Sequence, residues 1–375
     1  MADASAPPRL PEKLRQIVRG CDIAARRYGS SAPGVLLHLA RLYLRQRIGP
    51  RDALRMGLAD PATSPEALSG CVSKARLVSL QRRVNPDDLF WLTGDKAMFN
   101  SRCLQVGLPV ARTLAVFDPT TGPAAGGNVV SSRTAWEEFF STQLPREFII
   151  KPARSGFGEQ VHFFERTADR FQNSEGTYSA ANLYDLLASD VRHKQFVIQE
   201  RLESHPELVR LSGTPFLQTV RMTTFVDDKG RAEVLYVNFK IITGTNVIDN
   251  FRHGKTGNLV SNIAIDTGVL GAAMTIAPDG VGVVRVDAHP ATNVQIAGFQ
   301  LPFWGEAVAL ARSAAELFLP LRTLGWDVAL TPTGPVIVEA NHLWDPLPML
   351  LVGPQAPGVT RHGMHVMLDR LHGSA

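Results

Sequence analysis

The strongest chemical signal in the sequence is a group of oxygen-bearing side chains near its C-terminal end. Asp327 lies in the segment GWDVAL, and Glu339 and Asn341 lie in VIVEAN. The turn at 331–334 predicts that the two segments pair as antiparallel strands, with Asp327 and Glu339 facing one surface. Glu339 and Asn341 are two residues apart, so they share a face of their strand. Two carboxylates and an amide oxygen suit Mg²⁺, although a solvated sheet face is an equally good interpretation of these residues alone.

A second signal is the segment FIIKPARSGFGE at 148–159. Lys151 ends a predicted buried strand, and Ser155, Gly156 and Gly158 follow it. Glycines allow backbone N–H groups to approach phosphate oxygens, and the lysine supplies a positive charge. The lysine precedes the glycines, so the segment is not a Walker A loop. An ordinary hairpin turn is the alternative interpretation.

The remaining polar candidates are weaker individually. Glu200 and Leu202 follow the apolar segment FVIQ, and a chain leaving a strand there could present its backbone to an adenine ring. Glu207 could then accept hydrogen bonds from ribose hydroxyls, although a charged strand end explains these residues as simply. Four further polar residues lie in or beside predicted elements of the mixed region: Lys96, Arg221, Lys240 and Asn250.

The elements that must position these residues fall into a helical region and a region of mixed helices and strands. Residues 1–85 are predicted to be helical, with helices at 11–28, 34–47 and 50–57. After residue 85 helices and strands alternate, and Thr134 and Glu137 have the spacing of a capping box. The other expected helices lie at 96–106, 179–188 and 304–318. Strands are expected at 110–117, 147–152, 160–164, 195–199, 217–226, 232–242, 325–330 and 336–340.

Charge is distributed unevenly along the 375 residues. The chain has a net charge of +4, but residues 1–85 hold 15 Lys and Arg against 6 Asp and Glu, whereas the remainder holds 24 against 29. A basic head of this kind could attract nucleic acid, an anionic membrane or an acidic substrate, or could simply be a solvated helical face. Nucleic acid is disfavoured because aromatic residues for base stacking are scarce there.

Cysteine usage and hydropathy indicate the compartment. The three cysteines, Cys21, Cys71 and Cys103, form no CxxC pair, so we expect buried thiols in a cytoplasmic protein. No segment reaches the roughly 18 apolar residues of a membrane span. No secretory signal is recognisable at the N-terminus either.

The order of the motifs resembles the ATP-grasp superfamily over about residues 90–345. The segments QERLESHPEL, TVRMTTF and DNFRHGKTGN, together with the helical head, are most similar to the sugar-transfer-associated ATP-grasp family, with similarity to the glutamate-ligase branch. The resemblance implies an α+β fold in which two lobes close on ATP, preceded by a helical segment. The implied domains are a basic helical region at 1–85, N-terminal and central lobes with a Gly-rich lid at 86–192, and a C-terminal lobe with the metal site at 193–375.

The resemblance also implies a role for each candidate residue. The ATP phosphates would be bound by two lysines and a mobile lid, comprising Lys96, Lys151, Ser155, Gly156 and Gly158. Adenine and ribose would be held by Glu200, Leu202 and Glu207. The transferred phosphate or acyl phosphate would be steadied by the catalytic set Arg221, Lys240 and Asn250. Two Mg²⁺ or Mn²⁺ ions would be held by Asp327, Glu339 and Asn341.

The implied activity is an ATP-dependent carboxylate–amine ligase that forms an amide through an acyl phosphate and releases ADP and phosphate. Its partners would be a small-molecule carboxylate and an amine, sugar- or carrier-linked compounds included, in cell-surface glycan or natural-product biosynthesis. The alternatives are a phosphotransferase acting on a hydroxyl group and a nucleotide-binding module without activity. One departure from the ligase pattern is that Gly325 stands where some branches place an arginine, so Arg221 or Arg252 would have to supply that charge.

Overall fold

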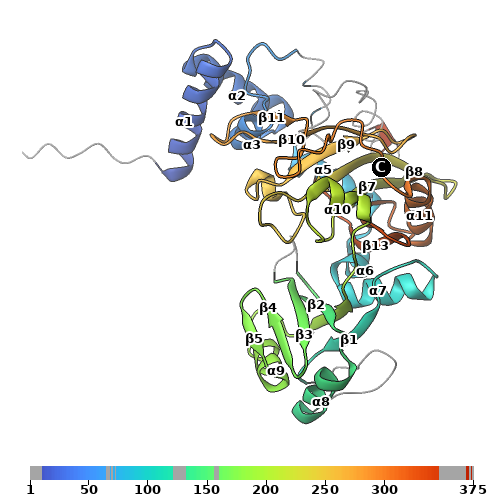
Figure 1. The fold of residues 1–375 in the computed structure, drawn as a ribbon. Coiled ribbons are helices and arrows are strands. Elements are labelled where there is room, and N and C mark those ends of the chain that lie inside the picture. Colours follow the sequence, from blue (N-terminus) through green and yellow to red (C-terminus); the bar gives the residue numbers. More distant parts are fainter. Residues whose placement is uncertain are drawn as a thin grey trace, which may run out of the picture.

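The computed structural model describes residues 11–64, 68, 71, 73–120, 132–155, 160–345, 369–370 and 373. Two separate sheets organise these residues, one of six strands and one of seven, and every pairing between neighbouring strands is antiparallel. Figure 1 shows the two sheets in two lobes, with the N-terminal helices on the lobe that holds the larger sheet. The predicted α+β class with an N-terminal helical segment is confirmed.

The smaller lobe is built on the six-stranded sheet, whose strand order is β1-β6-β2-β3-β4-β5. Its strands are β1 (Thr113–Phe117), β2 (Glu147–Pro152), β3 (His162–Thr167), β4 (Arg170–Asn173), β5 (Gly176–Tyr178) and β6 (Phe196–Glu200). Two helices, α8 (Arg133–Gln143) and α9 (Ala180–Ala188), pack on it around an aromatic core that includes Phe117, Trp136 and Phe148. The predicted capping box at Thr134 and Glu137 is wrong, because Ser132 caps α8 by accepting from the Ala135 N–H.

The larger lobe is built on the seven-stranded sheet, whose order is β11-β10-β9-β8-β7-β12-β13. Its strands are β7 (Thr219–Val226), β8 (Ala232–Ile241), β9 (Leu259–Ile263), β10 (Leu270–Ile276), β11 (Val283–Val286), β12 (Thr323–Thr331) and β13 (Gly334–Asn341). The long helix α11 (Trp304–Leu317) packs small residues such as Ala307 and Ala311 against Met222 and Trp326 of the sheet. The two short helices of this lobe are α10 (Pro206–Ser212) and η2 (Arg252–Gly254).

The N-terminal helices cover other residues of the same sheet. They are α1 (Glu12–Arg27), α2 (Ala32–Gln46), α3 (Pro50–Arg55) and α5 (Lys74–Val84). Their apolar side chains, such as Leu39 and Leu77, share one core with Phe225, Val260 and Met274 from the strands. Met222 belongs to the core under α11, whereas Phe225 belongs to the core under the head, so the sheet is covered by two separate layers.

The segment between the head and the smaller sheet links the two lobes. It comprises η1 (Asp87–Leu89), α6 (Trp91–Gly94) and α7 (Lys96–Gln105). The strand expected at 110–117 begins only at Thr113, because Val110 instead bridges to Ile337 of the larger sheet. The expected boundary at residue 192 falls before β6, which pairs inside the smaller sheet, so we propose that the C-terminal lobe starts after Glu200.

The cysteines lie in the interior, as expected from the sequence. All three cysteines are buried, and burial raises the pKa of the Cys71 thiol to about 11 and that of Cys103 to about 12. Among the helices in the described ranges, none combines the length and the apolar character needed to cross a bilayer.

Candidate functional site

A row of polar side chains crosses four neighbouring strands of the larger sheet. Asp327 of β12 lies opposite Glu339 of β13 on one side and opposite Arg221 of β7 on the other. Arg221 in turn lies opposite Asn238 of β8. Directly opposed residues in antiparallel strands project from the same face, so the pairing of strands distant in sequence assembles this row.

Asp327 is the centre of a buried charge cluster. Its carboxylate is 4% exposed and accepts hydrogen bonds from Arg221 Nε at 2.8 Å and Nη2 at 2.9 Å. Lys240 Nζ donates to the same carboxylate at 3.1 Å. Burial alone would raise the pKa of Asp327, but Arg221 and Lys240 together hold that pKa well below its usual range. The carboxylate is therefore ionised at neutral pH.

The second cation of the cluster has a second acid beside it. Lys240 Nζ lies 3.6 Å from Asp249 Oδ2, and Asp249 also accepts from the backbone N–H and hydroxyl of Thr219. Burial alone would lower the pKa of Lys240, but Asp249 and Asp327 raise it above the ordinary value. Asp249 was not identified from the sequence, and neither was Asn238. The spacing of Asn238 and Lys240, two residues apart on one strand, could have indicated Asn238.

Gly325 makes room for Arg221 in this cluster. A Cβ at position 325 would lie 3.3 Å from Cδ and Nη1 of Arg221 and 2.8 Å from Cβ of Trp344. The guanidinium of Arg221 thus occupies the space beside the residue two positions before Asp327. Of the two arginines considered for the missing charge, Arg221 is the one that the structure places on Asp327.

Two lysines outside the larger sheet, Lys151 of the smaller lobe and Lys96 of the linking helix α7, interact electrostatically with Glu339. Lys151, at the end of β2, is 6% exposed, and burial lowers its pKa to about 8 although Glu339 opposes the shift. Burial also lowers the pKa of Lys96, against Glu339 and Asp95, and its Nζ donates to the Ser155 carbonyl at 2.8 Å. Because Glu339 acts on both lysines, the strand end that carries Lys151 and the start of α7 lie within electrostatic range of β13.

Glu339 and Asn341 are the more accessible members of the predicted metal set. Both are partly exposed, and Asn341 Nδ2 donates to Glu339 Oε1 at 3.2 Å. Within the described ranges no group of three or more His, Cys, Asp or Glu residues is arranged to hold a metal ion. The candidate set of two carboxylates and one amide is of another kind, and its hard oxygen donors fit Mg²⁺. Asp327 could join them by sharing its oxygens with Arg221.

The nucleotide-base candidates lie apart from the charge cluster. Glu200 ends β6 and accepts from the Arg112 N–H at 2.8 Å, and Leu202 lies in the segment that leads to α10. Glu207 is exposed on α10, where Arg210 donates to it at 2.7 Å and lowers its pKa. No hydrogen bond or ion pair between described residues joins these three to the cluster.

Asn250 lies in the loop that also carries Asp249. Asn250 follows Asp249, and its carbonyl accepts from Asn258 Nδ2 at 3.1 Å, which fixes the loop beside the cluster. The predicted lid residues Gly156 and Gly158, and Glu159 beside them, lie outside the described residues.

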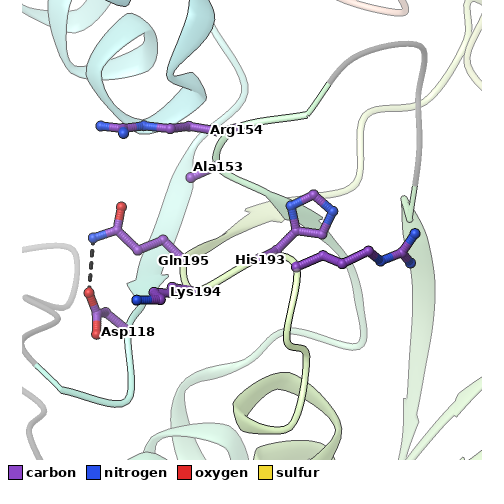
Figure 2. A pocket seen from close by; sticks show the side chains of 7 residues that line it. Asp118, Ala153, Arg154, His193, Lys194 and Gln195 are labelled. Atoms are coloured by element: carbon purple, nitrogen blue, oxygen red, sulfur yellow. Dashed lines mark hydrogen bonds between the residues drawn. The ribbon is translucent and has the colours of Figure 1, made fainter.

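A cavity of about 440 Å³ adjoins the base of the Lys151 segment. Figure 2 shows its lining, which comes from the end of β1, the residues after β2 and the residues before β6. Gln195 Nε2 donates to Asp118 Oδ2 at 2.9 Å across it, and Arg154 pairs with Asp95, the N-cap of α7. None of its lining residues belongs to the predicted site, so the cavity is distinct from the charge cluster.

A comparison with protein families decides the family. Residues 75–355 match the family described as sugar-transfer associated ATP-grasp, which is about three quarters of the chain. The chain belongs to this family. The expected ATP-grasp superfamily is thereby confirmed.

Solved structures to which this ATP-grasp protein is similar are distant in sequence. They include D-alanyl-alanine synthetase A from Vibrio cholerae O1 biovar eltor, with 11% identity and a TM-score of 0.43, covering 76% of this chain and 65% of that one. D-cycloserine synthetase has 17% identity and a TM-score of 0.39, with 80% and 79% covered. L-amino acid ligase from Bacillus licheniformis has 10% identity and a TM-score of 0.39, with 75% and 48% covered. The chain thus spans less than two thirds of the first of these structures. No curated protein matches it.

Proposed function

We propose that the protein is an ATP-dependent carboxylate–amine ligase that works through an acyl phosphate. The observation that supports this most directly is the buried Arg221–Asp327–Lys240 cluster beside Glu339, whose charge also acts on Lys96 and Lys151. Lysines opposite a carboxylate-rich edge would hold nucleotide phosphates against the acidic strands. Catalysis of phosphoryl transfer rests mainly on such positioning and charge neutralisation.

Each residue of the cluster has a role in this proposal. Lys96 and Lys151 bind the phosphates of ATP, and Ser155 lies at the base of the lid. Arg221 and Lys240 neutralise charge on the phosphoryl group while a substrate carboxylate attacks it, with Asn250 steadying the loop beside them. The attack forms the carboxyl oxygen–phosphorus bond as ADP leaves, and an amine then displaces phosphate. No protein nucleophile is needed.

The residues proposed to bind the adenosine part of ATP and those proposed to bind the metal lie on different elements. Glu200, Leu202 and Glu207 are proposed to hold adenine and ribose on the connection between the two sheets. Glu339 and Asn341, with Asp327, are proposed to hold Mg²⁺, which would screen the phosphate charges when bound. The proposed lid of Ser155, Gly156 and Gly158 would exclude water, because an acyl phosphate hydrolyses readily.

Trapping with hydroxylamine tests the activity. Purified protein is incubated with ATP, Mg²⁺ and a panel of amino acids and sugar acids, and ADP and hydroxamate are measured. A ligase gives acid-dependent ADP release and a hydroxamate. Phosphorylation of a hydroxyl without a hydroxamate would establish the phosphotransferase alternative instead, and ATP binding with no turnover for any acceptor would support a binding module.

Two variants connect that result to the site. Glu339→Gln removes a proposed metal ligand and is expected to abolish acid-dependent ADP release. Glu316→Gln is a matched control, because Glu316 lies on α11, where it accepts from the Ala232 N–H. Full activity of Glu339→Gln would overturn the metal assignment while leaving the ligase reaction itself intact.

A further inference from the structure

Within the described residues, the outer side of α2 is an exposed apolar surface. The buried side chains of this helix, Val35, His38, Leu39 and Leu42, face the core of the head. On the opposite side Leu36 is 50% exposed, Leu37 53%, Tyr43 48% and Leu44 70%. A helix that is apolar on both sides is expected only where both sides are buried.

The segment that contains α2 is rich in arginine. Between Asp22 and Asp52 the sequence contains six arginines and no acidic residue. Arg41 and Arg45 are exposed beside the leucines, and in the described part of the chain no ion pair joins either to an acidic side chain. Arg47 lies over the ring of Tyr43, 6.0 Å from its centroid.

The neighbouring helix adds to the surface. Leu14 and Val18 of α1 are 42% and 44% exposed, and α1 packs directly against α2. Figure 1 places α1 and α2 at the end of the molecule away from the smaller lobe with α8 and α9. A partner could therefore approach this surface without covering the facing edges of the two sheets.

We propose that the outer face of α2, defined as Leu36, Leu37, Arg41, Tyr43, Leu44 and Arg45, docks on an anionic phospholipid membrane. The leucines and the tyrosine ring would enter the boundary between head groups and acyl chains, and the arginines would bind lipid phosphates. This is the arrangement of an interfacial helix that lies in the plane of the membrane without crossing it.

Charge and chemistry favour a membrane over the other partners. A second copy of the chain would bring two α2 faces with exposed arginines and no acidic residue of their own together, and like charges would repel. Nucleic acid would meet leucines in place of the aromatic side chains on which bases stack. A bilayer rich in anionic lipid satisfies both the apolar residues and the arginines at once.

Flotation with vesicles tests the proposal on the full chain. The protein should float with vesicles of phosphatidylcholine and phosphatidylglycerol, much less with phosphatidylcholine alone, and less at high salt. Leu37→Gln/Leu44→Gln should weaken binding by about tenfold for each leucine withdrawn from the interface. Arg41→Gln/Arg45→Gln should weaken it by about fivefold for each charge and reduce the salt dependence.

The matched controls change exposed residues elsewhere in the chain. Leu104→Gln on α7, where Leu104 is 58% exposed, and Arg170→Gln on β4 should float like the wild type. All variants are exposed-site changes, and circular dichroism melting checks that each one is folded. Absence of flotation with anionic vesicles, or equal losses in the controls, overturns the proposal. Self-association that disappears in Leu37→Gln/Leu44→Gln, without vesicle binding, would make this face an interface between copies and overturn it as well.

Discussion

Asp327 accepts hydrogen bonds from cationic side chains of two strands, Arg221 on β7 and Lys240 on β8. A buried carboxylate with both oxygens engaged in this way is held in one orientation, with Glu339 directly opposite it. The cost of burying three charges is offset only while every partner is present. The cluster therefore contributes to stability and to the proposed chemistry together, and the two contributions can be separated by mutation.

Removing one partner should be more damaging than removing the pair. Arg221→Met leaves Asp327 buried with Lys240 alone, and the free energy of unfolding is expected to fall by about 3 kcal/mol. Arg221→Met/Asp327→Leu should recover most of that loss, because Lys240 keeps Asp249 as a partner. Urea denaturation measures both variants. A double variant that is less stable than the single one would contradict the pairing.

Lys151 gives the site a dependence on pH. Its pKa is lowered to about 8 by burial, so its charge is lost as the pH rises above that value. If Lys151 binds ATP phosphates, the affinity for ATP should fall between pH 7 and 9, as measured by calorimetric titration. Lys151→Arg should flatten the profile, since a guanidinium stays charged. An affinity that does not change over this range would contradict the assignment.

The same shift has the opposite sign in stability. The pKa of Lys151 in the folded protein is below its ordinary value of 10.5, so the folded state binds fewer protons than the unfolded state between about pH 8 and 10.5. The contribution of Lys151 to the free energy of unfolding should therefore rise with pH across this window.

At the scale of elements, two positions on the same face of β12, 325 and 327, are each restricted to one type of residue. Asp327 must face the cluster, and Gly325 must leave space for the Arg221 guanidinium and for Trp344. Trp344 is buried and donates from its indole N–H to the Thr323 hydroxyl at 3.2 Å, so it cannot easily move aside. The close approach therefore depends on the absence of a side chain at position 325.

Gly325→Ala tests this packing. Its Cβ would lie 2.8 Å from Cβ of Trp344, and overpacking of this kind is expected to cost about 1–3 kcal/mol of unfolding free energy. It should also lower ATP turnover by displacing Arg221 from Asp327. Gly305→Ala on α11 is the control, because a Cβ there meets nothing within 4 Å, and it should be neutral or stabilising. Equal effects of the two substitutions would contradict the packing argument.

The elements show how far sequence patterns reach. The hairpins 219–241 and 323–341 and strand β2 were predicted because apolar runs end at clear turns. The strands at 259–286 were not predicted, because β9 buries Ser261 and Asn262 among its apolar residues and loses the alternating pattern. The short strands β4 and β5 were missed for a related reason, since they have only four and three residues and Phe171 is their one buried side chain.

The candidate site was predictable in part for the same reason. The pairing of Asp327 with Glu339 follows from a turn between them, so the sequence was enough. The partners of Asp327 and Lys240 depend on which strands become neighbours and on how the loop with Asp249 closes. That information is not local, so Arg221 was one of two candidates and Asp249 was not considered.

At the scale of the whole molecule, the N-terminal helical head is hydrogen-bonded to strand β12, which carries Asp327. Asn85, at the end of α5, is fully buried and donates to the Thr323 carbonyl at 2.8 Å while accepting from the Thr323 N–H. Gln81 donates to the Trp344 carbonyl at 3.1 Å, and Lys74 pairs with Asp345. The head thus holds β12 and the chain that follows Asn341, whatever else its surface binds.

Asn85→Ala should loosen this fastening. Three backbone groups of Thr323 and His342 lose a partner in a buried place, and the free energy of unfolding is expected to fall by about 2–3 kcal/mol. ATP turnover should fall as well, because β12 carries Asp327. Asn182→Ala in α9 is the control, since Asn182 is exposed and should tolerate the change. Urea denaturation and ADP release measure both, and a wild-type result for Asn85→Ala would contradict the role of the head.

The long sequence separation between Arg221 and Asp327 has a consequence during protein synthesis. The two residues are 106 positions apart in the sequence, so a growing chain holds an unbalanced guanidinium until its last two strands emerge. A truncated product that ends before β12 would hold Arg221 without Asp327, whereas Lys240 would keep Asp249 as a partner. Such a product would also lack Asp327, Glu339 and Asn341, the proposed metal ligands, so we expect it to show no Mg²⁺-dependent turnover of ATP.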